Sequence, residues 1–90
     1  MSKLLKTAQA GTVESGDVLV TLSPAEPGAG IQVELVSPTM QQYGAHIKEL
    51  IKNILLSAEI SDATVHANEK GALDYAIEAR VKTALARASS

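Results

Sequence analysis

Ser15 is the residue of this 90-residue chain whose setting best suits chemistry. It lies between two acids in the run Glu14-Ser15-Gly16-Asp17, and β-forming residues dominate the flanking stretches 12–14 and 17–23. Ser-Gly between such stretches predicts a hairpin with a two-residue turn, because glycine tolerates the positive φ that tight turns require. A serine at a hairpin tip is exposed, and Gly16 adds no side chain beside it. The pattern therefore predicts a serine that another enzyme can reach and modify.

The same four residues are also typical of an ordinary turn. In that interpretation Asp17 only caps the turn, and Ser15 has no chemical role. If Ser15 is modified, Asp17 either helps the modifying enzyme to bind or again only caps the turn. The local pattern leaves these alternatives open.

No other group of residues predicts an active site or a metal site. His46 and His66 are expected on a helix flank and on the solvent side of a short strand, and neither has a metal-ligand spacing. The chain has no cysteine, which excludes disulfides, thiolate metal sites and a cysteine nucleophile. A thiol that takes part in the function must therefore come from a bound group. We predict no catalytic residue and no metal.

The composition limits the partners. The chain is 46% hydrophobic and 20% charged with a net charge of −2, and Tyr43 and Tyr75 are its only aromatic residues. Without stacking rings or a basic face, nucleic-acid binding is not expected. No apolar run approaches the roughly 18 residues that span a bilayer, and no secretory signal is visible. We expect a cytoplasmic protein without membrane contact.

Hydrophobic periodicity predicts the remaining elements. A loop is expected at 24–30 and a strand at 31–35, with Ile31, Val33 and Leu35 on one buried face. A helix is expected from about Thr39 to Ser57, a short strand at 63–67, and a last helix from about 71 to 88. The apolar stripes of the two helices are Ile47, Leu50, Ile51, Ile54 and Leu55, and Leu73, Ile77, Val81 and Leu85.

The order β-β-β-α-β-α predicts an α+β fold. An antiparallel-rich sheet with two helices packed on one face is the economical arrangement for it. The chain is long enough for one domain, residues 1–90, with one core. Residues 1–10 carry no strong pattern, which is typical of a flexible arm that docks or frays.

Two segments together resemble a known family, the citrate lyase acyl carrier protein (gamma subunit). They are Ala10-Gly11-Thr12-Val13-Glu14-Ser15-Gly16-Asp17-Val18 near the start, and Lys70-Gly71-Ala72-Leu73-Asp74, Ala79-Arg80-Val81 and Leu85-Ala86-Arg87-Ala88 near the end. The resemblance covers nearly the whole chain.

The resemblance implies a non-catalytic carrier subunit. In that family the serine at the position of Ser15 carries 2'-(5''-phosphoribosyl)-3'-dephospho-CoA through a phosphodiester, placed there by a prosthetic-group transferase. The thiol of the group holds an acetyl thioester. An alpha (transferase) subunit exchanges acetyl for citrate, and a beta (lyase) subunit cleaves the citryl thioester to oxaloacetate and restores the acetyl form.

Two other functions remain open. The malonate decarboxylase acyl carrier also has a Ser-Gly-Asp segment and a similar prosthetic group, although the C-terminal segments match the citrate lyase carrier better. The other alternative is a small α+β scaffold or regulatory subunit in which Ser15 is inert. The usual phosphopantetheine-carrying helical bundle is not expected, because its Asp-Ser-Leu motif and all-helical pattern are absent.

Overall fold

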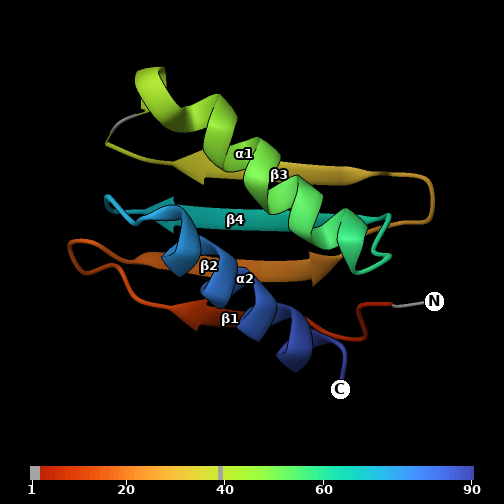
Figure 1. Cartoon of the computed structure of the whole chain (residues 1–90). Coiled ribbons are helices and arrows are strands. Elements are labelled where there is room, and N and C mark those ends of the chain that lie inside the picture. Colours follow the sequence, from red (N-terminus) through yellow and green to blue (C-terminus); the bar gives the residue numbers. More distant parts are fainter. Residues whose placement is uncertain (1–2, 39) are drawn as a thin grey trace.

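A four-stranded mixed sheet forms one layer of the molecule. The structure is a computed structural model that describes residues 3–38 and 40–90. The strands are β1 (Ala8–Gly11), β2 (Val18–Pro24), β3 (Ile31–Val36) and β4 (Ala63–Glu69), in the spatial order β1-β2-β4-β3 (Figure 1). The β1–β2 and β2–β4 pairs are antiparallel, and β3 pairs with β4 in parallel. A parallel pair needs a long crossover, which a helix between β3 and β4 supplies.

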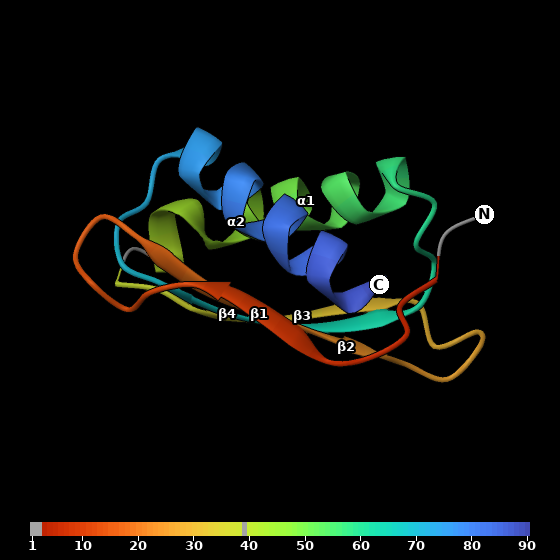
Figure 2. The ribbon, with the colours of Figure 1, turned by 90° about the horizontal axis from the view of Figure 1, so that it is seen from below.

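Two helices, α1 (Met40–Ser57) and α2 (Asp74–Ala88), cover one face of this sheet (Figure 2). The predicted α+β class, the order β-β-β-α-β-α and the antiparallel-rich sheet are thereby confirmed. The start of α1 expected near Thr39 lies outside the described residues. In the part of the chain that the structure describes, neither helix is long and apolar enough to cross a bilayer.

Alternation in the two central strands places the core between the sheet and the helices. Val18, Val20 and Leu22 of β2 point inward together with Ala63, Val65 and Ala67 of β4, and all six are buried. The helices meet them with Ile47, Ile51 and Leu55 of α1 and with Ile77, Val81 and Ala84 of α2. Each large aliphatic side chain in such a core stabilises the fold by about 1.5–3 kcal/mol.

The face expected for residues 31–35 is less buried than predicted. Ile31, Val33 and Leu35 pack against the core but are only partly covered. The reason is that β3 is an edge strand of the sheet and has a neighbour on one side only.

Of two predictions at the N-terminal end, the form of the hairpin is wrong, and the arm expected to dock or fray docks where the structure describes it. The hairpin does not have a two-residue turn, since β1 ends at Gly11, β2 begins at Val18, and residues 12–17 connect them. Nor is all of 1–10 a flexible arm: residues 8–10 lie in β1, Leu4 is buried, and the Leu5 N–H donates to the Ala88 carbonyl at 2.8 Å. Pairing with β2 and the end of α2 orders a segment that carries little β signal of its own.

The stripe predicted for the last helix is also wrong at its first position. α2 begins at Asp74, and Leu73 precedes it as the N-cap residue with 62% of its surface exposed. The remaining members of that stripe, Ile77, Val81 and Leu85, do face the core.

Candidate functional site

Ser15 lies exposed at the second position of a four-residue turn, 14–17. The Asp17 N–H donates to the Glu14 carbonyl at 3.0 Å, and Gly16 has a φ of 84°. A turn with positive φ at its third position is of the type that favours glycine there. A Cβ added to Gly16 would meet no atom within 4 Å, so backbone conformation and not space explains the glycine. The predicted exposure of Ser15 is confirmed.

Backbone hydrogen bonds join this turn to the residues that follow β4. The Gly16 N–H donates to the Lys70 carbonyl at 2.7 Å, and the Lys70 N–H donates to the Asp17 carbonyl at 2.9 Å. The bond from Lys70 to Asp17 continues the β2–β4 register beyond its last pair, Val18 with Glu69, whereas the bond from Gly16 is displaced from that register by one residue. The backbone that follows Ser15 is therefore held to the residues after β4.

The Asp17 carboxylate ties the turn to α2. Arg80 donates to it twice, from Nε to Oδ1 at 3.1 Å and from Nη2 to Oδ2 at 2.9 Å. Thr12 Oγ1 donates to Oδ2 at 2.7 Å, and the Val18 N–H donates to Oδ1 at 2.7 Å. The hydrogen bonds from Arg80, and then those from Thr12 and Val18, hold the pKa of Asp17 well below its usual range. Asp17 in turn raises the pKa of Arg80.

A shallow groove of about 440 Å³ runs beside Ser15 along α2. Its walls include Glu14 and Gly16 from the turn and Tyr75, Ala79 and Arg80 from the helix. Tyr75 is 74% exposed, so its ring is available to a ligand or partner. Because the pair with Asp17 uses Nε and Nη2, the Nη1 group of Arg80 can face a second anion.

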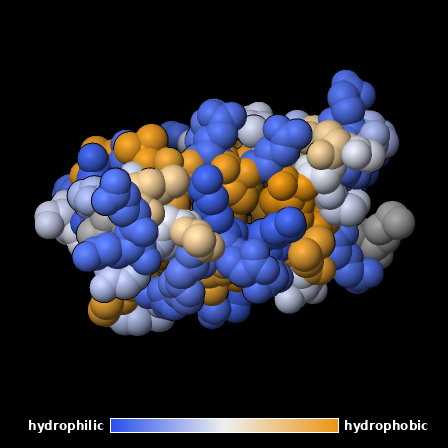
Figure 3. All heavy atoms as spheres, turned by 90° about the horizontal axis from the view of Figure 1, so that it is seen from above, coloured by the Kyte–Doolittle hydropathy of each residue, from blue (hydrophilic) through white to orange (hydrophobic). Residues whose placement is uncertain are grey.

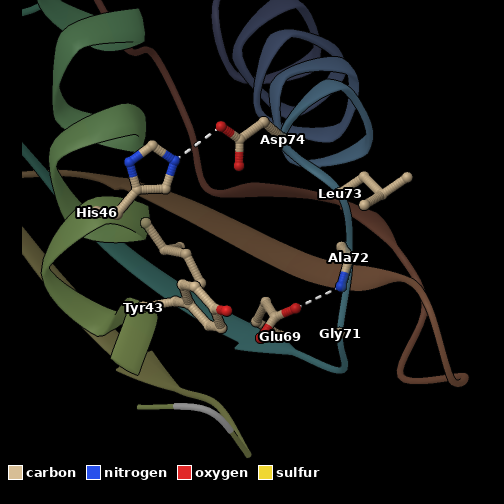
Figure 4. A pocket seen from close by; sticks show the side chains of 8 residues that line it. Tyr43, His46, Glu69, Gly71, Ala72, Leu73 and Asp74 are labelled. Carbon is tan, nitrogen blue, oxygen red and sulfur yellow. Dashed lines mark hydrogen bonds and ion pairs between the residues drawn. The ribbon is translucent and has the colours of Figure 1, made fainter. Parts of the chain in front are cut away.

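Sequence reasoning missed a second concavity, of about 540 Å³, between α1 and residues 69–74 (Figure 4). Tyr43 and Glu69 point toward each other in it, and His46 Nε2 lies 2.7 Å from Asp74 Oδ2 on its wall. Glu69 is only 1% exposed, yet Ser37 Oγ donates to its Oε1 at 2.6 Å and the Ala72 N–H donates to its Oε2. Its polar groups are thus already paired within the chain.

The sequence held a signal for Glu69. The inward-facing residues of β4 recur at every second position from Ala63 to Ala67, and one more step reaches Glu69. The pairing of His46 with Asp74 carries no such signal, because these residues are on different elements. His66 lies exposed on the outer side of β4, as expected, with its Nδ1 3.6 Å from Glu34 Oε1. Among residues 3–38 and 40–90, no cluster of three or more possible metal ligands occurs.

The chain matches known acyl carriers over nearly its full length. A family model of acyl carrier proteins, described as the malonate decarboxylase delta subunit (MdcD), matches residues 5–88. The citrate lyase acyl carrier protein of Halothermothrix orenii is 42% identical over 97% of this chain and 90% of its own length. That of Rhodopseudomonas palustris is 42% identical over 96% of this chain and 87% of its own length.

A solved structure has the same fold. It is a chain of a Pseudomonas malonate decarboxylase hetero-tetramer in complex with malonate, similar with a TM-score of 0.66 and 22% identity over 96% of this chain and 87% of that chain. At this identity the likeness establishes the fold alone. The two citrate lyase carriers are more similar in sequence and match over nearly the whole chain, which shows that the chain belongs to the citrate lyase acyl carrier protein family.

Proposed function

We propose that the chain is the acyl carrier subunit of a citrate lyase, with 2'-(5''-phosphoribosyl)-3'-dephospho-CoA attached to Ser15 through a phosphodiester. The observation that carries this proposal is the exposed Ser15 at a turn that is hydrogen-bonded to Lys70 and Arg80 and lies beside a groove. An enzyme that modifies a side chain needs it accessible and in a defined place. Ser15 meets both requirements.

The residues around Ser15 fit this group. A phosphodiester on the serine oxygen adds a negative charge beside Glu14, and the Arg80 guanidinium in the same groove can offset it. The exposed Tyr75 ring offers a face on which a nucleobase can stack. When bound, the group supplies a thiol that carries the acyl group as a thioester, which this cysteine-free chain cannot do by itself.

The chain's own residues then have a carrier's role and not a catalyst's. The turn holds the attachment point, the groove positions the first part of the arm, and the core keeps both in place. A tethered thioester meets two active sites at high effective concentration. The proposed partners are the alpha (transferase) and beta (lyase) subunits and a prosthetic-group transferase, and the proposed compartment is the cytoplasm.

A malonate decarboxylase carrier is the second candidate. The family model and the solved structure both favour it, since both are described as malonate decarboxylase proteins. The names of the relatives at 42% identity favour citrate lyase. Reconstitution separates the two. The carrier should restore oxaloacetate formation from citrate with citrate lyase alpha and beta subunits, and should not support malonate decarboxylation with the subunits of that enzyme.

Intact mass tests the attachment. Protein from cells that make the whole citrate lyase set should gain the mass of one phosphoribosyl-dephospho-CoA group, located by peptide mapping on the peptide with Ser15. Ser15→Ala should lose the gain and keep the fold, whereas Ser61→Ala, another exposed serine, should keep both. An unmodified wild-type mass after incubation with the modifying enzymes would favour the scaffold alternative.

A further inference from the structure

The pocket drawn in Figure 4 begins next to the turn that holds Ser15. The Gly16 N–H of that turn donates to the Lys70 carbonyl at 2.7 Å, and Gly71, the next residue, lines the pocket. Consecutive Cα atoms are about 3.8 Å apart, so the wall of the pocket starts one residue from the contact with the turn. A group tethered to Ser15 therefore has this cavity of about 540 Å³ in its immediate surroundings.

The rim of the pocket is exposed and largely apolar. Leu73 lines it with 62% of its surface exposed, and in Figure 4 its side chain points away from Tyr43, which is 54% exposed on the α1 wall. Tyr75, two residues after Leu73, lines the groove beside Ser15. Figure 3 shows apolar residues exposed at the end of the molecule where α1 begins. A flexible chain that lies in the groove can therefore continue over apolar surface into the pocket.

The lining of the pocket selects by charge. Among the described residues it contains two carboxylates, Glu69 and Asp74, and no lysine or arginine. Asp74 is paired with His46 at 2.7 Å, so a proton on His46 would only balance Asp74, and Glu69 would still leave the lining negative. Like charges repel, and they do so more strongly away from water. The pocket therefore disfavours phosphates and carboxylates and suits a neutral group, whereas the groove offers Arg80 to anions.

We propose that this pocket receives the neutral end of the prosthetic arm, its pantetheine chain with the free thiol or the acetyl thioester, and excludes the citryl form. The inference rests on the proposed function, since it needs the arm on Ser15. A tethered group has an effective concentration in the millimolar range, so it occupies even a weak site beside its attachment point. A free partner has no such advantage.

The size and chemistry of the pocket fit this occupant. Its volume lies in the range of small-molecule sites, about 300–1,000 Å³. Tyr43, Ile47 and Ala72 supply apolar surface, and the Tyr43 hydroxyl can donate to an amide or thioester carbonyl. The acetyl thioester is thereby sheltered from water. A citryl group, which carries carboxylates, stays in solvent, where the proposed partner subunits can reach it.

The test uses the arm as the only thiol of a cysteine-free chain. Iodoacetamide and iodoacetate each alkylate the isolated loaded carrier: the thiol loses its proton to the buffer, a sulfur–carbon bond forms and iodide leaves. The two products differ in that one carries a neutral amide and the other a carboxylate. We expect the NMR signals of Tyr43 and Ala72 to differ between the two products, and those of the neutral product to be the ones shifted from the unmodified Ser15→Ala carrier. Leu56, at the other end of α1, should give the same signals in all three.

Access to the thiol is the second measurement. Tyr43→Ala removes one wall of the pocket, so the arm of this variant should react with iodoacetamide roughly threefold faster than that of the wild type. The matched control is Leu56→Ala, which removes a side chain of similar exposure from the same helix and should leave the rate unchanged. Thermal unfolding should show that both variants stay folded.

Either measurement can overturn the proposal. Identical Tyr43 signals in the two alkylated products would do so, and so would equal reaction rates in Tyr43→Ala and Leu56→Ala. If a side chain of a partner subunit fills the pocket instead, the Tyr43 signals would move only when that subunit is added. Failure of the carrier function is distinct, because Ser15 would then stay unmodified in the mass measurement, whereas a loaded carrier without shifts at Tyr43 overturns the pocket alone.

Discussion

Replacing Leu73 by serine should stabilise the protein. The N-cap backbone at this residue is extended, with φ −74° and ψ 158°, which is the conformation in which a serine oxygen can accept an N–H of the first helical turn. A capping hydrogen bond of this kind contributes about 0.5–2 kcal/mol. For a domain of this size, about 1 kcal/mol raises the thermal midpoint by roughly 4–8 °C. Loss of the exposed leucine side chain itself should have little effect, because water covers most of it in both states.

The assay is thermal unfolding followed by circular dichroism, with Leu73→Ala as the control. Alanine removes the same side chain but offers no capping oxygen, so the difference between the two variants isolates the cap. Slower amide exchange at Tyr75 and Ala76, in the first turn of α2, should accompany the gain. A Leu73→Ser protein no more stable than Leu73→Ala would refute the reasoning that leucine at this position costs the fold stability.

Three further perturbations test the turn and the core. Asp17→Asn should destabilise the protein at neutral pH, because the pKa of Asp17 is depressed in the fold. Below about pH 4 the unfolded chain takes up the proton first, so the difference in urea midpoint between wild type and variant should shrink. A difference that stays constant down to pH 2 would contradict this. Gly16→Val should lose about 1–2 kcal/mol through its positive φ and slow the modification of Ser15. The matched variant Gly28→Val, also at positive φ in open space, should lose similar stability but keep the rate at which Ser15 is modified. Equal rates of Ser15 modification in the Gly16 and Gly28 variants would show that the turn does not matter to the modifying enzyme. Ile51→Ala should lose about 2–5 kcal/mol in urea unfolding, since the side chain is fully buried, and a loss below 1 kcal/mol would mean that the core is misassigned.

The sequence was most informative where one element carries a long periodic pattern. The stripe around Ile51 placed α1 correctly, and alternation in residues 31–35 identified the side of β3 that packs against the core, because these patterns follow directly from helix and strand geometry. It failed at β1, where Ala8-Gln9-Ala10 has no β-branched or aromatic residue. That strand exists because β2 and the end of α2 supply its partners, and such contacts leave no trace in local pattern.

The candidate site divides in the same way. Local turn chemistry predicted that Ser15 would be exposed beside Gly16. It could not predict that Asp17 binds Arg80, because 63 residues separate them and either residue alone would suit a solvent-exposed position. The pocket beside Glu69 depends equally on contacts between distant segments. The sequence therefore predicts which residue carries the proposed group, while the surface around that residue is visible only in the folded chain.

Helix α2 holds the turn that contains Ser15. Arg80, two turns into the helix, holds the Ser15 turn through two hydrogen bonds to Asp17. Arg80→Gln, which cannot form the same charged pair with Asp17, should therefore slow acyl transfer by the proposed alpha subunit on the modified carrier. An unchanged rate of acyl transfer by the Arg80→Gln carrier would show that the contact between Arg80 and Asp17 does not matter to this step.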